Sequence, residues 1–171
     1  PANFLLVGAM NPCPCGYFGH PTRRCTCSAA AAQRYLSRVS GPLLDRIDLH
    51  IEVPPVEFEQ LASKSPGESS ASIRERVNRA IQRKRFAGTG LLFNSQIPPH
   101  LLKDLCPLTD GAQKLLKNAF SLMGLSARAY DRLLKVSRTI ADLAGQDMID
   151  STHVAEAVQY RSLDRKYWQT R

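Results

Sequence analysis

The first residues of the chain contain an apolar run that constrains its fold more than any other segment. Residues 4–10, Phe-Leu-Leu-Val-Gly-Ala-Met, are apolar without interruption and have the length of a β-strand. A strand of this kind is covered on both faces, as in the parallel sheets of α/β proteins. A second segment, residues 47–53, alternates apolar and polar side chains, which predicts a strand with one buried face.

Two strands joined by helical connections do not make a stable sheet by themselves. We therefore expect the missing strands to come from a part of the polypeptide before Pro1, and the chain to be a piece of a longer protein. No apolar run has the ~18 residues needed to cross a bilayer, and none resembles a signal peptide. This predicts a cytoplasmic protein that has no membrane partner and whose thiols are reduced.

The remainder of the chain has the periodicity and the capping residues of helices. Helices are predicted at residues 29–36, 42–46, 72–86, 110–123, 127–144 and 151–160. The predicted N-caps are Thr109 and Ser126, and the predicted stops are Gly124 and Gly145. Ser72 and Glu75 have the spacing of a capping box at the start of the third helix. The expected fold class is mixed α/β but mostly helical, with two parallel strands near the N-terminus.

Four of the five cysteines form two Cys-x-Cys pairs within one short loop. They are Cys13, Cys15, Cys25 and Cys27. Four thiolates suit a closed tetrahedral zinc site with a structural role, and the surrounding glycines and prolines allow the tight turns of a small knuckle. His20 is an alternative fourth ligand, and redox-active or simply reduced thiols remain alternatives to metal. Cys106, between Leu105 and Pro107, is predicted to be a small core residue.

The chain is basic, with a formal net charge of +8, which favours anionic partners such as nucleic acid or nucleotides. Residues 74–85 contain six basic side chains and one acidic side chain. Arg76, Arg79 and Arg83 fall on one face of the predicted helix and could follow a DNA phosphate backbone. The alternative is a solvated helix face, and no aromatic residue interrupts the run to suggest base stacking.

Two single polar residues occupy positions where a ligand would explain them. Asn11 follows the apolar run, at the strand end where parallel sheets bind ligands, although Asn before Pro12 is also ordinary turn chemistry. Arg128 lies in the first turn of the helix that Ser126 begins, where the helix dipole disfavours a cation and favours a bound anion. An exposed arginine without a role is the alternative. Arg128, Arg132 and Lys135 share one helix face.

Five stretches of the sequence resemble one family along nearly the whole chain. They are AMNPCPCG (9–16), QRYLSRVSGPLLDRIDLHIEVP (33–54), GESSASIRERV (67–77), LSARAYDRLLKVSRTIADLAG (125–145) and HVAEAVQYR (153–161). In this order they resemble the C-terminal part of the magnesium chelatase-like AAA+ ATPases of the ComM/YifB group. The resemblance implies the end of an AAA+ core at residues 1–58 with a Cys-rich insertion at 12–28. A linker at 59–70 and a helical lid at 71–171 would follow.

The resemblance also implies roles for three residues. Asn11 corresponds to sensor 1, Arg128 to sensor 2, and Arg46 to an arginine finger that acts in trans on the phosphate bound by a neighbouring subunit. Such a finger can contribute about 10³–10⁵ in rate in other phosphoryl-transfer enzymes. A local ion pair between Arg46 and either Asp45 or Asp48 is the alternative.

Arg38 is a second finger candidate. The family's cofactors are ATP and Mg²⁺, but no G-x-x-x-x-G-K-[ST] motif and no acidic Walker B pair occur in these residues, so this piece alone is expected to be inactive. The parent is expected to be a hexameric ring that acts as a DNA branch-migration motor in recombination or competence. A porphyrin-metallating chelatase with partner subunits is the first alternative, and a non-enzymatic zinc-containing DNA-binding module is the second.

Overall fold

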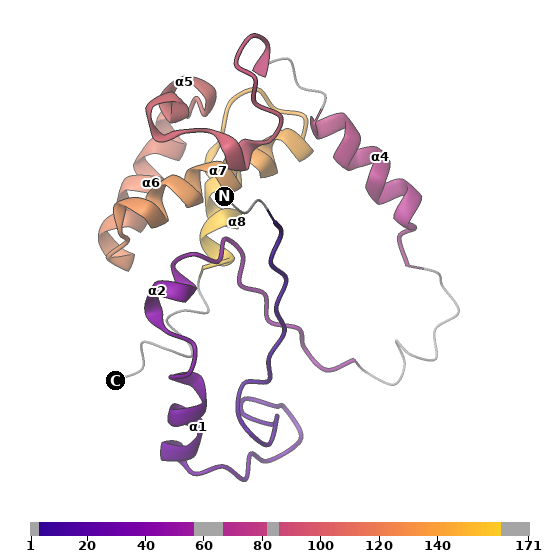
Figure 1. Ribbon diagram of the computed structural model, residues 1–171, viewed down its shortest axis with the longest axis vertical. Helices are drawn as coiled ribbons and strands as arrows, with labels where there is room; N and C mark the ends of the chain where they lie inside the picture. Colours follow the sequence, from indigo (N-terminus) through magenta and orange to yellow (C-terminus); the bar gives the residue numbers. More distant parts are fainter. Residues whose placement is uncertain (1–3, 57–66, 82–85, 162–171) are drawn as a thin grey trace.

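The C-terminal region, residues 86–161, is a group of helices packed around one long helix, α7. The computed structural model describes residues 4–56, 67–81 and 86–161. The helices of this region are η2 (Asn94–Gln96), η3 (Pro99–Leu101), α5 (Leu102–Leu105), α6 (Asp110–Met123), α7 (Ala127–Leu143) and α8 (Ser151–Gln159). Helix α8 packs against both α6 and α7, while α5 and η2 contact α7 (Figure 1).

Local hydrogen bonds determine where α6 and α7 begin and end. The Thr109 Oγ1 atom accepts the N–H of Ala112 at 3.2 Å, and the Ser126 Oγ atom accepts the N–H of Ala129 at 3.2 Å. Gly124 follows α6 with φ +58°, a left-handed conformation that glycine adopts at little cost. The predicted caps are confirmed, and the predicted ends of α7 and α8 are correct to one residue.

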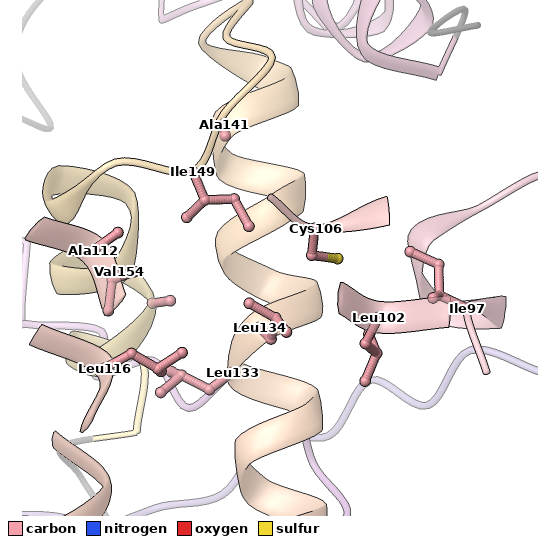
Figure 2. Packing of buried hydrophobic residues seen from close by; sticks show 11 residues of the cluster. Ile97, Leu102, Cys106, Ala112, Leu116, Leu133, Leu134, Ala141, Ile149 and Val154 are labelled. Atoms are coloured by element: carbon pink, nitrogen blue, oxygen red, sulfur yellow. The ribbon is translucent and has the colours of Figure 1, made fainter. Parts of the chain in front are cut away.

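The core of the C-terminal region joins buried residues of α5, α6, α7 and α8 with three residues of the adjoining loops. Its buried members are Ile97, Leu102, Cys106, Ala112, Leu116, Leu133, Leu134, Ala141, Ile149, Val154 and Ala157. Figure 2 shows Leu116 and Val154 on one side of α7, and Leu102 and Ile97 on the other. Full burial of each large aliphatic side chain contributes about 1.5–3 kcal/mol. Cys106 is confirmed as a core residue, since it is buried within this cluster.

A buried arginine fastens the C-terminal turn of α7, and sequence reasoning missed it. Arg138 is fully buried, and its Nε atom donates to Asp142 Oδ1 at 3.1 Å. The same guanidinium donates to the carbonyl oxygens of Asp147 (2.6 Å) and Gln146. Asn94 Nδ2 donates to the other Asp142 oxygen at 2.8 Å. Pairing and hydrogen bonding allow the Arg138 charge to be buried, and the bond from Asn94 connects η2 to α7.

The N-terminal region, residues 4–56, contains two short helices and no strand in its described part. These are α1 (Ala29–Leu36), which has the predicted bounds, and α2 (Gly41–Leu44), which ends two residues before the predicted position. Residues 4–10 run as an extended trace (Figure 1). Their side chains are exposed, and Leu5 and Val7 have exposed fractions of 88% and 83%.

The predicted strands at 4–10 and 47–53 are therefore wrong for this structure. The described residues contain a single isolated bridge, between Leu108 and Ile149, which lies in the C-terminal region instead. A strand exists only where a second extended backbone pairs with it along its length, and in the described residues neither segment pairs with such a strand. The origin of the partner strands in another part of the polypeptide stays a prediction.

Helix α4 (Ser70–Ile81) lies beside α7, and its beginning differs from the predicted one. The N–H of Ser72 donates to the Ser69 Oγ atom at 3.2 Å, so Ser69 provides the cap. The capping box of Ser72 and Glu75 is wrong, because the Ser72 hydroxyl instead donates to Glu68. The predicted linker at 59–70 lies mostly outside the described residues.

Candidate functional site: arginines around residues 45–50 and a four-cysteine knuckle

Arg46 is exposed just after α2, with its guanidinium held by one neutral acceptor. Its Nη1 atom donates to the carbonyl oxygen of Pro42 at 2.7 Å. The alternative of an ion pair with Asp45 or Asp48 is not observed, because both carboxylates face other arginines. The side chain of the other finger candidate, Arg38, is exposed beyond the end of α1.

The residues around Arg46 are bonded to the C-terminal region. Arg132 of α7 donates through Nη1 to Asp48 Oδ1 at 2.6 Å and to the carbonyl oxygen of Arg46. Arg161, just after α8, donates to the carbonyl oxygen of Ile47 at 3.3 Å. Its Nη2 atom lies 3.7 Å from Asp45 Oδ1. Segments more than 80 residues apart in the sequence therefore meet here.

Arg161 was not singled out by sequence reasoning, although the structure buries it almost completely, with an exposed fraction of 2%. It follows α8 directly, and the backbone of the preceding Tyr160 also takes part, since its carbonyl oxygen accepts the N–H of His50 at 2.8 Å. The only available signal was its place in the HVAEAVQYR stretch. A charge at the end of a helix is usually solvated, so its burial was not predictable from the pattern.

The basic face of α7 divides into one exposed cation and two engaged ones. Arg128 lies exposed in the first helical turn and has no ion pair among the described residues. Arg132 is bonded to the segment around Arg46, and Lys135 Nζ donates to the carbonyl oxygen of Ser95 at 3.1 Å. Of the three cations, Arg128 is therefore the one whose charge remains available at the start of the helix, where an anion is favoured.

Asn11 is exposed at the end of the extended N-terminal segment. A side chain at Gly16 would meet its carboxamide nitrogen at 3.7 Å, so the asparagine lies against the turn that begins the cysteine loop. In the described part of the chain, no hydrogen bond joins Asn11, Arg46 and Arg128. The sensor and finger roles of these three residues therefore stay predictions.

The four clustered cysteines converge on one point. The Sγ atoms of Cys13 and Cys15 are 3.4 Å apart, and Cys25 lies 3.7 Å from the first and 3.5 Å from the second. All four sulfurs, including that of Cys27, lie within 4.8 Å of one another. Zinc–sulfur bonds of about 2.3 Å at tetrahedral angles place ligand sulfurs ~3.8 Å apart. The four residues therefore fit a tetrahedral thiolate site.

The knuckle loop is shaped by glycines and by ring contacts. Gly16 and Gly19 adopt φ values of +83° and +77°, which side-chain-bearing residues rarely tolerate. The His20 Nδ1 atom accepts the backbone N–H of Arg23 at 3.1 Å, so this imidazole supports the loop and does not join the sulfur cluster. The Arg23 guanidinium lies 5.3 Å from the centre of the Tyr17 ring.

The surroundings of the cysteines favour a thiolate at Cys15 and disfavour it at Cys25. Backbone N–H groups of Tyr17 and Thr26 lower the pKa of Cys15 to about 5. The N–H of Cys27 lowers the pKa of Cys25, but burial and the neighbouring thiols outweigh it and raise that pKa to about 12. Four thiolates at these distances repel one another strongly, and a bound cation removes the repulsion.

The predicted DNA-binding face is only partly available. Arg76 forms a bidentate pair with Glu68, with Nη–Oε distances of 2.5 and 3.1 Å, and this pair lowers the pKa of Glu68. Arg79 is exposed on the same helix, whereas Arg83 lies outside the described residues. Arg76 would therefore have to exchange a carboxylate for a phosphate in order to bind DNA.

Two family models together cover nearly all of the chain. The C-terminal domain of the magnesium chelatase subunit ChlI matches residues 67–161, and magnesium chelatase subunit ChlI matches residues 1–61. The competence protein ComM of Haemophilus influenzae is 45% identical over 168 residues, and YifB of Escherichia coli is 42% identical over 167 residues. Each alignment covers 96% of this chain but 32% of the relative.

A protein of Mycobacterium tuberculosis strain H37Rv is 36% identical over 163 residues, which cover 94% of this chain and 32% of that relative. The chain thus spans about a third of the length of the curated relatives it matches. The match of the C-terminal domain alone extends over more than half of the sequence and includes every helix from α4 to α8. The chain belongs to the magnesium chelatase ChlI family and resembles its ComM/YifB members.

Proposed function

We propose that the chain is the nucleotide-responsive end of a ring-forming AAA+ ATPase, with residues 1–58 completing the core and residues 71–171 forming the lid. The observation that carries this proposal is the state of Arg46. Arg46 is exposed and, among the described residues, its guanidinium is bonded to one neutral carbonyl oxygen, while the acids on either side are bound by other arginines. A guanidinium in this state is free to exchange its acceptor for a phosphate oxygen.

In this proposal each of three residues senses the nucleotide from a different direction. Arg46 acts in trans on the γ-phosphate of a neighbouring subunit, Arg128 contacts phosphate from the lid, and Asn11 orients a γ-phosphate oxygen or the attacking water. ATP with Mg²⁺ supplies the phosphoryl group and its neutralising cation. The Walker motifs belong to the part of the protein outside these residues, so this piece alone should not hydrolyse ATP.

The output that we propose for the full protein is movement of DNA in recombination or competence. The relative from Haemophilus influenzae is named a competence protein, the chain has a net charge of +8, and α4 presents Arg79. The ring is proposed to be a hexamer in the cytoplasm. Insertion of Mg²⁺ into a porphyrin, with partner subunits, is the second candidate, and it is favoured by the family to which both matching models belong.

We also propose a structural zinc ion bound by Cys13, Cys15, Cys25 and Cys27. The sulfur–sulfur distances support it, as do the backbone N–H groups that stabilise thiolate at Cys15. Four thiolate ligands leave no open position for substrate, so the ion would hold the loop after Asn11 and take no part in hydrolysis. The alternative function, a zinc-containing DNA-binding module without ATPase activity, would use the same zinc site but would need no arginine finger.

The test of the ATPase proposal uses the full-length protein with Arg46→Ala. ATP hydrolysis should fall by about 10³-fold or more, while nucleotide binding and ring formation stay unchanged, because the finger touches only the neighbour's phosphate. Arg38→Ala tests the second finger candidate, and a large loss of hydrolysis there with normal hydrolysis by Arg46→Ala would assign the finger to Arg38. Normal hydrolysis by Arg46→Ala would overturn the assignment of Arg46 as the arginine finger. Absence of ATP binding by the full-length protein would favour the non-enzymatic DNA-binding module.

A second comparison separates the two enzymatic outputs. Full-length protein with ATP is given a four-way DNA junction at several salt concentrations, and separately a porphyrin with Mg²⁺. Salt-dependent junction binding with ATP-dependent strand exchange supports the DNA motor. Metallation of the porphyrin without junction activity would support the chelatase.

A further inference from the structure

The segment that carries Arg46, residues 45–50, is held at successive positions by two arginines of the C-terminal region. We propose that Arg132 and Arg161 are positioning residues that aim Arg46 at the neighbouring subunit, a proposal that rests on the proposed function of Arg46. We call residues 45–50 the finger segment, and Arg132 with Arg161 the arginine latch.

The latch contacts the finger segment on both sides of the Arg46 Cα atom. Arg132 holds the Arg46 carbonyl oxygen and the Asp48 carboxylate, the latter at 2.6 Å. Arg161 holds the carbonyl oxygen of Ile47 at 3.3 Å and lies 3.7 Å from the carboxylate of Asp45. Four consecutive residues are therefore fastened to the C-terminal region, and the direction in which the Arg46 side chain leaves the backbone is fixed.

The same contacts keep the two acids away from the finger. Asp45 and Asp48 are close enough in sequence to Arg46 to form local ion pairs, and a carboxylate would be a strong competitor for the guanidinium. Each acid is engaged by a latch arginine, so within residues 4–56, 67–81 and 86–161 the acceptor of Arg46 is the Pro42 carbonyl oxygen. A neutral acceptor is exchanged for a phosphate more easily than a carboxylate is. The latch thus leaves the charge of Arg46 uncompensated.

The two latch arginines differ in how firmly they are held. Arg161 is 2% exposed, so solvent and salt screen its contacts little. The Arg132 and Asp48 side chains are 27% and 57% exposed, so their pair is the more easily broken of the two. Arg132 is therefore the member of the latch whose bonds can change without unfolding the region around it.

The latch also connects the finger to the nucleotide site of its own subunit. Arg128 precedes Arg132 by four residues on α7, so the two lie on one face of a continuous helix. A movement of α7 when Arg128 meets a phosphate would move Arg132 and, through it, the carbonyl oxygen of Arg46. The nucleotide bound in one subunit would then control the finger that serves the next one.

The experiment measures amide hydrogen exchange and ATP hydrolysis on the full-length protein with Arg132→Met. Exchange in the finger segment should rise by about 10-fold or more, and kcat should fall by about 10- to 100-fold with KM for ATP unchanged. Arg132→Lys keeps a donor and should recover part of both effects. Lys135→Met, one turn along α7, is the matched control and should change neither. Unchanged exchange in Arg132→Met overturns the latch, whatever happens to hydrolysis.

A double variant separates positioning from a structural role. Arg46→Ala with Arg132→Met should have the same kcat as Arg46→Ala alone, because Arg132 acts through Arg46. A further loss equal to that of the single Arg132→Met variant would contradict positioning. If Arg132→Met does not fold, Asp48→Asn removes the ion pair from the other side but leaves the Arg132 bond to the Arg46 carbonyl oxygen, so it should change exchange and kcat in the same direction by a smaller factor, and no change in exchange would overturn the latch.

The outcomes distinguish this proposal from the proposed function. If Arg46→Ala hydrolyses ATP normally, the finger assignment fails, while faster exchange in Arg132→Met still demonstrates the contact. For the link to nucleotide, exchange of the finger segment should differ between ADP and a non-hydrolysable ATP analogue, and Arg132→Met should abolish the difference. Equal exchange in both nucleotides would overturn control of the finger by the subunit's own site.

Discussion

The N-terminal and C-terminal regions of this chain are folded to very different degrees by their own residues. The C-terminal region buries a cluster of apolar side chains around α7, in which residues as far apart as Ile97 and Val154 take part. The N-terminal region leaves Leu5 and Val53 with exposed fractions of 88% and 82%. An apolar segment this exposed is typical of a surface that another element covers. The C-terminal region therefore forms a core from its own residues, whereas the apolar side chains of the N-terminal region need another element to cover them.

The cysteine knuckle is the exception within the N-terminal region, because a metal would replace the missing core. Structural zinc contributes about 10–16 kcal/mol in small zinc-binding peptides, so Cys15→Ser should release the metal and unfold the loop from Cys13 to Cys27. Elemental analysis and hydrogen exchange of this loop measure the effect. Cys106→Ala is the control and should keep the metal. Less than about half an equivalent of zinc in the wild-type chain would count against the site.

The C-terminal core should respond to truncation in the usual way for a packed interior. Leu133→Ala should lower the free energy of unfolding by about 2–5 kcal/mol, because Leu133 is buried against α6 and α8 residues. Leu122→Ala is the matched control, and with a side chain 75% exposed it should change stability by less than about 0.5 kcal/mol. Chemical denaturation of the 171-residue chain measures both values. Equal effects of the two variants would contradict the self-contained core.

A smaller, pH-dependent effect is expected at the start of α8. The N–H of Ser151, followed by the hydroxyl of Thr109, lowers the pKa of Asp150. The folded-state pKa lies below the usual value of about 3.9, so the stabilisation is complete above that value and is lost as the pH falls through the folded-state pKa. Thermal unfolding below pH about 4 should show this loss, and Asp150→Asn, which keeps a capping side chain, should reduce the pH dependence. If Asp150→Asn leaves the pH dependence of thermal unfolding unchanged, this contribution of Asp150 to stability is contradicted.

The smallest effect is expected in the extended N-terminal segment. Leu5→Ala should change the stability of this chain by less than about 0.5 kcal/mol, since Leu5 is exposed. In the full-length protein the same variant should cost about 2–5 kcal/mol, because a sheet would then cover the segment. The difference between the two unfolding free energies is the measurement. A substantial loss in the short chain, or none in the long one, would end the contrast between the regions.

Local chemistry explains which parts of the fold were predictable. The caps Thr109 and Ser126 and the stop at Gly124 were identified correctly, because each satisfies backbone groups within its own turn. The cap of α4 was assigned to Ser72 instead of Ser69, since a run of serines offers several capping oxygens and only the folded backbone selects one. The four cysteines were identified because their spacing keeps them within one short loop.

The sequence by itself determined most helices, the caps Thr109 and Ser126 and the cysteine loop, since these depend on residues that are neighbours along the chain. Only the tertiary structure decided that Arg138 and Arg161 are buried and that Asp48 pairs with Arg132 and not with Arg46. It also left residues 4–10 and 47–53 without strand partners in the described part of the chain. Strand pairing and the burial of a charge both need a distant partner, and the pattern of a single segment contains no record of that partner.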